Sequence, residues 1–228
     1  LQAFCLVNEE KDIPALIADG NYKAVVSNLL EAKGLNYGQL PKGLLLFHRA
    51  GETIRTAMEE HLAEGAMYAK NNAGEVNIHF TVSPEHKALF EQLVSEKKQA
   101  YEEKFSVGYD LSFSVQKPST DTVAADMENN PFRDKNGKLL FRPGGHGALI
   151  ENLNDIDADV VFVKNIDNVV PDSFKCSTVI FKKVIAGVLV TLQERIFNYL
   201  NLIETGKYSH DQVEEMIHFL QDDLCIKN

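Results

Sequence analysis

The alternation of strand-like and helix-like stretches is the feature that most constrains how this chain can fold. Strand-like patterns recur at a spacing of roughly 30 residues, with helical patterns between them. They cover residues 40–47, 76–83, 110–116 and 158–168. In α/β proteins this order produces a largely parallel sheet whose faces are covered by the intervening helices. We therefore predict an α/β fold with a mixed, mainly parallel sheet flanked by helices.

The strand patterns differ in the burial that they imply. Residues 76–83 alternate apolar and polar side chains, which is typical of a strand with one buried face. Residues 158–168 instead contain four consecutive apolar residues, Val160–Val163, and are predicted to form a central, buried strand. The polar stretch 117–138 is expected to be a long connection.

Helical stretches are identified by apolar residues spaced three and four apart. They cover residues 21–33, 52–70, 84–105, 174–205 and 210–223. Ser83 followed by Pro84 is expected to begin the third of these helices. Ser209 with Gln212 has the capping-box pattern that begins the last. The stretch 174–205 also contains enough β-branched residues for a strand to be the alternative.

Composition and charge exclude several classes of protein. Thirty-three acidic against twenty-three basic residues give a net charge of −10, the wrong sign for a general binder of nucleic acids or anionic membranes. The longest apolar run, 184–192, is shorter than the roughly 20 residues that cross a bilayer, and is predicted to be a buried core segment. Cys5, Cys176 and Cys225 lack metal-ligand spacing, which favours reduced thiols and a cytoplasmic protein. We therefore expect no nucleic-acid and no membrane partner.

Both ends of the sequence fall next to helical patterns. Leu1 lies within LQAFCLV, and the last residues directly follow the final helix. This favours a fragment of a longer protein. We predict that residues 1–228 form a single domain, in which 206–228 are a C-terminal helical appendage.

A glycine-rich stretch precedes the helix expected at 148–154. Gly144, Gly145 and Gly147 surround His146. Backbone N–H groups at a positive helix end can bind an anion, and the absence of side chains would let a nucleotide or a sugar approach. The alternative is a simple turn in which His146 takes the place of an N-cap residue.

Two other loops carry residues suited to phosphate chemistry. Lys42 stands in a tight turn before a strand, where it could place a compact charge on a phosphate, although a lone loop lysine is usually just solvated. Asp167 follows the apolar run of 158–168, where its carboxylate could hold Mg²⁺ together with substrate phosphates. The alternative is a strand-ending turn rich in Asn and Asp.

Several other polar residues are assigned structural positions. Glu60 and His61 are predicted to lie on the surface of the 52–70 helix, and His79 is expected to pack under a helix or a loop. No HExxH or GxSxG motif is present, and no nucleophile has an obvious neighbouring base, so hydrolase chemistry is not indicated.

Taken in order, these stretches resemble the UDP-sugar pyrophosphorylases, a family of nucleotidyltransferases. The matching stretches are Phe113-Ser-Val-Gln116, Arg142-Pro-Gly-Gly-His-Gly147 and Val161-Phe-Val-Lys-Asn-Ile-Asp-Asn168. That family has an FNQ strand end, a PPGHGD loop and an (F/Y)(V/I)xNxDN strand in the same order. The segment LPKGLLLF is similar to the family's GPKSL(I/L) segment. Over its whole length the chain is also similar to an uncharacterised bacterial family, domain of unknown function 4301.

The resemblance to the pyrophosphorylases implies a Rossmann-like, GT-A-like nucleotidyltransferase fold. It also implies a Mg²⁺-dependent reaction between a nucleoside triphosphate and a sugar 1-phosphate, which gives a nucleotide sugar and pyrophosphate. In that reaction Lys42 would neutralise charge on the phosphates, and Asp167 would bind the metal. The implied nucleotide and sugar contacts are Gln116, Gly144, Gly145, His146, Gly147, Asn165 and Asn168.

Two departures from the family pattern leave other functions open. Ala148 stands in place of the acid of GHGD, and no Gly-Gly-x-Gly-Thr loop is present. We expect that phosphate-binding loop to precede Leu1, so that this 228-residue stretch is inactive alone. The alternatives are a module that binds a nucleotide sugar without turnover, and a structural or interaction fragment.

Overall fold

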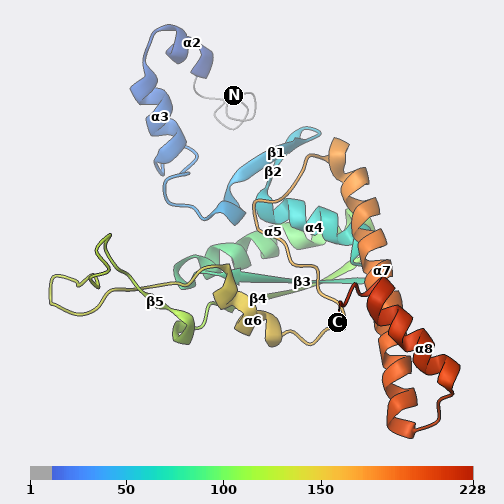
Figure 1. Cartoon of the computed structure of the whole chain (residues 1–228). Coiled ribbons are helices and arrows are strands. Elements are labelled where there is room, and N and C mark those ends of the chain that lie inside the picture. Colours follow the sequence, from blue (N-terminus) through green and yellow to red (C-terminus); the bar gives the residue numbers. More distant parts are fainter. Residues whose placement is uncertain (1–11, 228) are drawn as a thin grey trace. The chain divides into compact units, whose positions relative to one another are not determined.

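The computed structural model describes residues 12–227, which form a mixed α/β structure with helix in about half of its residues. The chain divides into two compact units, Leu1–Cys176 and Ser177–Asn228. Figure 1 labels the helices and strands of both units.

Two parallel strands form the centre of the first unit. Strand β3 (Glu75–Val82) pairs with β4 (Gly108–Val115) in unbroken register, from Glu75 opposite Gly108 to Val82 opposite Val115. These strands confirm the predictions at 76–83 and 110–116. Because the two strands are in register, their apolar residues share one face of the sheet and their polar residues share the other.

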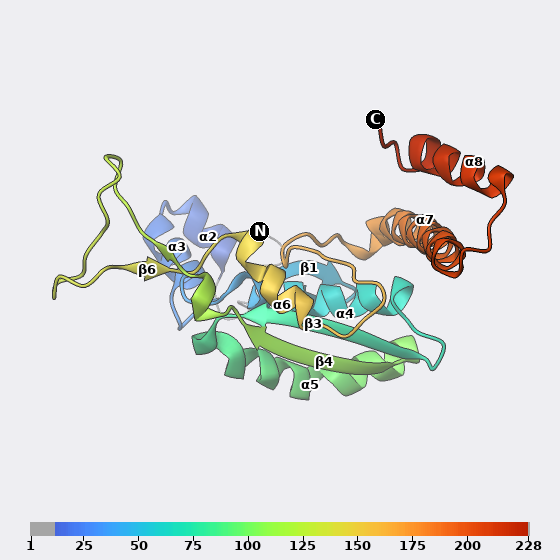
Figure 2. The ribbon, with the colours of Figure 1, turned by 60° about the horizontal axis from the view of Figure 1, so that its bottom comes forward.

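Helices α4 (Ala57–Tyr68) and α5 (Lys87–Phe105) cover the apolar face of the sheet. One cluster joins both helices to both strands, and a second surrounds Phe80. The buried members of the two clusters are Met58, Leu62, Ala63, Val76, Phe80, Val82, Phe90, Tyr101, Val107 and Tyr109. Figure 2 shows α5 along one side of the two strands, and the short helix α6 (Ile150–Asn154) on the other side.

The polar face of the sheet is where α6 attaches. Asn152 is buried, and its Nδ2 donates to Ser114 Oγ and to the carbonyl of Val115, each at 2.9 Å. The expected helix at 148–154 is present, but it begins with the 3₁₀ turn η4 (His146–Leu149), so the glycine-rich loop leads directly into it.

A β-hairpin precedes α4. The 3₁₀ turn η1 (Lys42–Leu44) leads into β1 (Leu46–Ala50), which pairs antiparallel with β2 (Thr53–Thr56). The predicted helix 52–70 therefore begins late, because its first residues pair as a strand. Thr56 and Glu59 form a capping box that fixes the start of α4.

The other helices of this unit agree with the sequence in part: the predicted stretches 21–33 and 84–105 contain helices, whereas the helix at Ile13–Ala18 was not predicted. Two helices, α2 (Ile13–Ala18) and α3 (Tyr22–Leu30), come first. Ser83 does not cap α5, because its hydroxyl is hydrogen-bonded to His86 Nδ1 at 2.7 Å. The 3₁₀ turn η2 (Pro84–His86) fills the interval, and α5 begins after it.

The long connection after β4 forms an arm. Two of its backbone hydrogen bonds join residues that are eight positions apart in the sequence. After the turn η3 (Pro118–Thr120), strand β5 (Thr122–Val123) pairs with β6 (Phe141–Arg142). The backbones of Ala124, Phe132 and Leu140 bond to one another in a closed cycle. Figure 1 shows this arm extending away from the β3–β4 sheet.

The prediction of a central, buried strand at 158–168 is wrong. The segment has no strand among the described residues, and Val163 is exposed. It instead runs extended along α4, where the Phe162 ring meets Tyr68 at 4.9 Å between centroids. An apolar run becomes a strand only where its backbone pairs with another strand, and residues 158–168 are assigned to none.

The second unit is a helical hairpin. Helix α7 (Asp172–Thr205) begins in the first unit and continues into the second, where α8 (His210–His218) and the π-helical turn η5 (Phe219–Asp223) follow it. The long helix at 174–205 and the capping box of Ser209 are confirmed. The prediction that 184–192 is buried is wrong, because Val184, Ile185 and Val188 are all more than half exposed.

Candidate functional site

Lys42 and Asp167 meet at the candidate site although 125 positions separate them in the sequence. The ammonium group of Lys42 donates to Asp167 Oδ2 at 2.5 Å. Both side chains reach solvent, so a ligand could separate them at little cost. The hydrogen bond from Lys42 is the main cause that lowers the pKa of Asp167 below its ordinary value, and the charge of His146 adds to it.

The backbone at Gly43 brings these two residues together. A Cβ at this position would lie 2.6 Å from Phe90 Cε1 and 3.2 Å from Ile166 Cγ1. The 3₁₀ turn can therefore pack against both side chains only because residue 43 is glycine. This close contact places Lys42 beside the residue that follows Ile166.

Helix α4 positions the segment that carries Asp167. The buried ammonium of Lys164 pairs with the buried Glu64 at 2.5 Å, and His61 Nε2 donates to the carbonyl of Ile166 at 3.0 Å. Burial lowers the pKa of His61, so the ring is held neutral in this contact. Together with the contact between Phe162 and Tyr68, these two contacts hold the backbone of residues 162–166 next to Asp167.

Glu60 is buried and His61 is half-buried, which corrects the prediction that they lie on the surface. Glu60 accepts a hydrogen bond from the buried Lys175, and Arg55 Nη1 lies 3.5 Å from it. Arg55 also pairs with Asp172 at 2.7 Å. The polar face of α4 is covered by residues that follow 160 in the chain, and helical periodicity alone contains no sign of that segment.

The glycine-rich loop lies against the end of β4. A Cβ on Gly144 would lie 2.7 Å from the carbonyl of Thr120, 2.8 Å from Ala148 Cβ and 3.6 Å from Gln116 Nε2. Gln116 itself donates to Thr120 Oγ1 at 3.2 Å. Gly144 is therefore required by its neighbours, and it brings Gln116 beside the loop.

Gly145 and Gly147 differ from Gly144. A Cβ on either would meet nothing within 4 Å, and neither has the positive φ that favours glycine. The fold of the described residues does not require glycine at either position. His146 lies between them, in a loop that also brings Gly144 beside Gln116.

Asn165 and Asn168 frame Asp167 in a turn. The N–H of Asn168 donates to the carbonyl of Asn165 at 3.0 Å, and both residues are exposed. The structure thus brings together the sequence-predicted residues Lys42, Asn165, Asp167 and Asn168, while Gln116 lies next to Gly144 of the loop that carries His146. Among the described residues, no hydrogen bond joins Gln116 directly to Asp167.

The residues around Asp167 fit a metal that arrives with phosphates. No group of three or more His, Cys, Asp or Glu side chains that could hold a metal occurs in the part of the chain that the structure describes. Mg²⁺ needs few protein ligands, because one or two carboxylates with substrate phosphates and water can complete its octahedron. Asp167 and its asparagine neighbours offer such a partial set of oxygen ligands.

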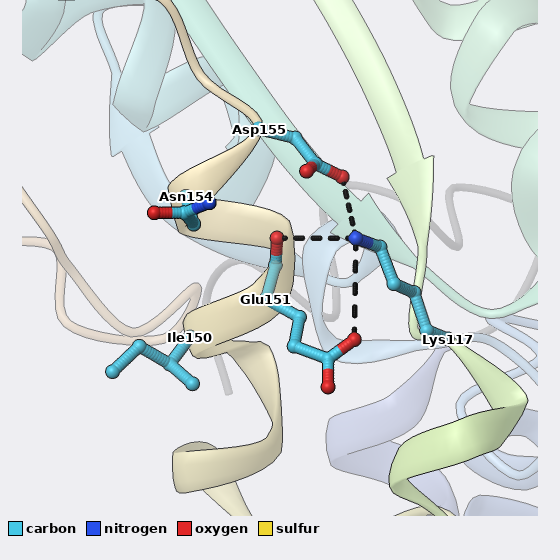
Figure 3. A pocket seen from close by; sticks show the side chains of 5 residues that line it. All are labelled: Lys117, Ile150, Glu151, Asn154 and Asp155. Carbon is cyan, nitrogen blue, oxygen red and sulfur yellow. Dashed lines mark hydrogen bonds and ion pairs between the residues drawn. The ribbon is translucent and has the colours of Figure 1, made fainter.

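A hollow of about 440 Å³ lies next to the end of β4. Its lining residues are Lys117, Ile150, Glu151, Asn154 and Asp155, which Figure 3 shows from close by. Lys117 Nζ pairs with Asp155 Oδ2 at 2.7 Å and lies 3.4 Å from the carbonyl of Glu151. The hydrogen bond with Asp155 raises the pKa of Lys117. No sequence motif marks this hollow, whose Lys117 directly follows Gln116 in the chain.

One further polar cluster lies on the polar face of the sheet. His79 is hydrogen-bonded through Nδ1 to Ser112 Oγ and through Nε2 to Ser114 Oγ, both at 2.8 Å. Alternate residues of a strand share one face, and His79 lies opposite Ser112 in the parallel pair. Ser114, two residues further along, therefore lies on the same face, so this contact could have been predicted from the sequence. Both ring nitrogens are hydrogen-bonded to serines and neither to a carboxylate, so the serines lack the third member of a hydrolytic triad.

Comparison with known proteins gives one match. The family model described as "Domain of unknown function (DUF4301)" matches residues 1–228. No curated protein matches the chain, and no solved structure does.

Proposed function

Because the chain belongs to the DUF4301 family, whose description assigns no activity, we propose its function from the candidate site: it binds a nucleotide sugar in the manner of a sugar nucleotidyltransferase. The observation that carries the proposal is the contact between Lys42 and Asp167 next to the loop of His146. Three segments far apart in sequence supply the parts of the proposed site: a flexible cation, a carboxylate and an open glycine loop. This combination suits a phosphorylated ligand with a bulky base or sugar.

Each part of the site has a role in this proposal. Gln116 hydrogen-bonds the base, as its place beside Gly144 allows. Gly145 and Gly147 leave open space that the base and the sugar occupy. Asn165 and Asn168 hydrogen-bond the sugar hydroxyls from the turn that carries Asp167.

The proposed reaction is nucleotidyl transfer. A phosphate oxygen of a sugar 1-phosphate attacks the α-phosphorus of a nucleoside triphosphate. The bond from that phosphorus to the oxygen bridging to the β-phosphorus breaks, and pyrophosphate leaves with the oxygen. Such a reaction depends on positioning and charge neutralisation more than on covalent catalysis. Lys42, released from Asp167, neutralises charge on the phosphates, and the similarity to the UDP-sugar pyrophosphorylases in sequence order supports this assignment.

Asp167 would hold Mg²⁺ in this proposal. When bound, the ion would neutralise phosphate charge and orient the phosphates. The carboxylate is ionised at neutral pH, since its pKa lies below the ordinary value.

A titration with nucleotide sugars tests the proposal. Isothermal titration calorimetry with UDP-glucose and a panel of other nucleotide sugars, each with Mg²⁺, would be compared between the wild type and Lys42→Met. We expect binding to at least one ligand and a loss of at least about tenfold in the variant, because a phosphate contact is removed. Lys87→Met, which removes an exposed lysine paired with Glu91 on α5, is the matched control. If no nucleotide sugar binds, the proposal is wrong.

Glycine substitutions make the test more specific. Gly145→Val and Gly147→Val place side chains in space that the protein leaves open. We expect both to weaken binding while the melting temperature stays close to that of the wild type. Binding that is unchanged in both variants would remove this loop from the ligand site.

Binding without turnover is the second candidate function. Ala148 in place of the acid of the pyrophosphorylase loop, together with the single carboxylate at Asp167, favours it. An assay of pyrophosphate release with pairs of nucleotides and sugar 1-phosphates separates the two when it is run on a longer protein, because these 228 residues are predicted to be inactive alone. Release that depends on Asp167 supports the transferase, whereas binding with no release for any pair supports a sensor.

A further inference from the structure

Helix α7 exposes a large apolar surface in the second unit. Seven large apolar side chains between Ser177 and Val190 are 37% to 67% exposed. They are Ile180, Phe181, Val184, Ile185, Val188, Leu189 and Val190. At about 100 Å² for each half-exposed large side chain, they present on the order of 700 Å², more than monomeric proteins usually expose in one patch. The surface therefore needs a partner.

The spacing of these residues indicates that the partner is a helix. Thr178, Phe181, Ile185, Val188 and Leu192 follow one another at alternating intervals of three and four. This spacing places them in one stripe along the helix, the seam along which two helices pack lengthwise.

The C-terminal half of α7 already has such a partner within the chain. Tyr199 Oη donates to Glu215 Oε1 at 2.6 Å, and its ring lies 5.3 Å from that of the buried Phe219. Arg195 pairs with Asp223 at 2.5 Å and lies over the Phe219 ring. Figure 1 shows α8 folded back along this half of α7. The half from Ser177 to Val190 is left exposed.

The segment that covers the C-terminal half of α7 is as long as the exposed stretch in its N-terminal half. Helix α8 with η5, His210–Asp223, runs for as many residues as Ser177–Val190. It also exposes apolar side chains of its own, Ile217 and Leu220. In an antiparallel two-fold pair, the α8 that covers the C-terminal half of one α7 lies beside the N-terminal half of the other.

We propose that a second copy of this chain covers the 177–190 stretch, through two-fold pairing of the α7–α8 hairpins into a four-helix bundle. A two-fold interface needs a surface that is complementary to itself, and an uncharged stripe along a helix meets that need. The exposed apolar area is close to the roughly 800 Å² per partner of a standard interface. Neighbouring antiparallel helices in such bundles pack through this kind of seam.

A membrane is the other possible partner of α7. By length and composition the helix could cross a bilayer, and it is the one such helix among residues 12–227. However, Lys182 and Lys183 interrupt it, and the apolar run between them and Glu194 is much shorter than the roughly 20 residues that a span requires. The observations therefore favour a second copy.

The oligomeric state of the whole chain tests the proposal. Sedimentation equilibrium over a dilution series, with reductant because Cys176 and Cys225 are exposed, would be run on the wild type and on Ile185→Glu with Val188→Glu. We expect a wild-type dimer, and a dissociation constant raised at least about tenfold in the variant, because two charges enter the seam. Lys183→Glu changes the net charge by the same amount on the opposite side of the helix, and is expected to leave the dimer intact.

Two further measurements keep the outcome interpretable. Ile185→Ala with Val188→Ala keeps helix propensity and removes apolar area, so it should weaken the dimer while the far-ultraviolet circular dichroism stays unchanged. Flotation with phosphatidylcholine–phosphatidylglycerol vesicles tests the membrane. A wild type that is monomeric throughout the series, that floats with vesicles as a monomer, or whose dimer resists both seam variants overturns the proposal.

Discussion

Asp167 shows how one neighbour sets the charge state of a site residue. Its pKa lies below the ordinary value of 3.8, chiefly through the hydrogen bond from Lys42. A lowered carboxyl pKa stabilises the fold above the unfolded-state pKa, and that contribution is lost as the pH falls through the lower folded value. At neutral pH the pair is therefore fully formed.

The Lys42→Met substitution tests this at the residue itself. We expect the pKa of Asp167 to rise towards its ordinary value, because the hydrogen bond and the charge of Lys42 are both removed. Carbon-13 NMR of the aspartate carboxyls over an acid titration measures the change. Lys87→Met should leave the Asp167 curve where it is in the wild type. An Asp167 curve that is the same in all three proteins would show that Lys42 and Asp167 do not pair in solution.

The buried pair of Lys164 and Glu64 has a larger effect on stability. Lys164→Met leaves the Glu64 carboxylate buried without its cation, since both side chains are nearly inaccessible. We expect the free energy of unfolding to fall by about 3 kcal/mol or more, the usual cost of breaking a buried pair from one side. Urea unfolding at neutral pH measures it.

The double variant Lys164→Met with Glu64→Gln is the control for that experiment. It removes both charges, so it should recover part of the lost stability. If the double variant is less stable than Lys164→Met alone, desolvated charge is not the cause.

At the scale of elements, sequence patterns predicted the helices and strands whose own residues determine them. Strands β3 and β4 and helix α5 lie where alternation and helical spacing put them, because each pattern is complete within its own segment. The segment 158–168 and the run 184–192 were mispredicted, because burial of an apolar run depends on what lies beside it. The polar face of α4 was mispredicted for the same reason.

In the candidate site too, some features follow from a segment's own residues and others depend on its neighbours. The order of FSVQ, the glycine-rich loop and the NIDN turn predicted which segments carry the site residues. The contact of Lys42 with Asp167 depends on the packing of three elements around Gly43, which a single sequence does not encode in any local pattern. Likewise, glycine is sterically required at Gly144 but not at Gly145, although both stand in one motif.

Packing at Gly43 provides a test of how the elements join. Gly43→Ala would force a Cβ to within 2.6 Å of the Phe90 ring, so the turn, α5 or the extended segment must shift. We expect a loss of about 1–3 kcal/mol, typical of overpacking. Gly145→Ala meets open space and should change stability by less than about 0.5 kcal/mol. Thermal and urea unfolding compare the two, and equal stability would mean that η1 does not pack as described.

At the scale of the whole molecule, the two units differ in how much they bury. The core clusters lie in the first unit, around β3, β4, α4 and α5. In the second unit Phe219 is the buried apolar residue among those described. Few buried contacts mean a low free energy of local opening.

Native-state hydrogen exchange should resolve the two units. We expect slow exchange in β3, β4 and α5, and faster exchange in α8 and in the 177–205 part of α7. Dimerisation through the α7–α8 hairpins should slow exchange in the second unit as the protein concentration rises, because burial reduces local opening. Exchange in the second unit that is slow and independent of concentration would show that the hairpin is stable alone.

The two exposed thiols give this division an experimental use. Cys176 is the last residue of the first unit, and Cys225 lies near the end of the second. With Cys5 replaced by serine, nitroxide labels at these two positions would form one spin pair within each chain. Double electron–electron resonance on the doubly labelled protein, diluted with unlabelled protein, would then report the separation of the labels. Because Cys176 lies on α7, the width of that distribution would measure how freely the end of the chain after α8 moves relative to α7, and a ligand that narrows it would reveal coupling between the site and the hairpin.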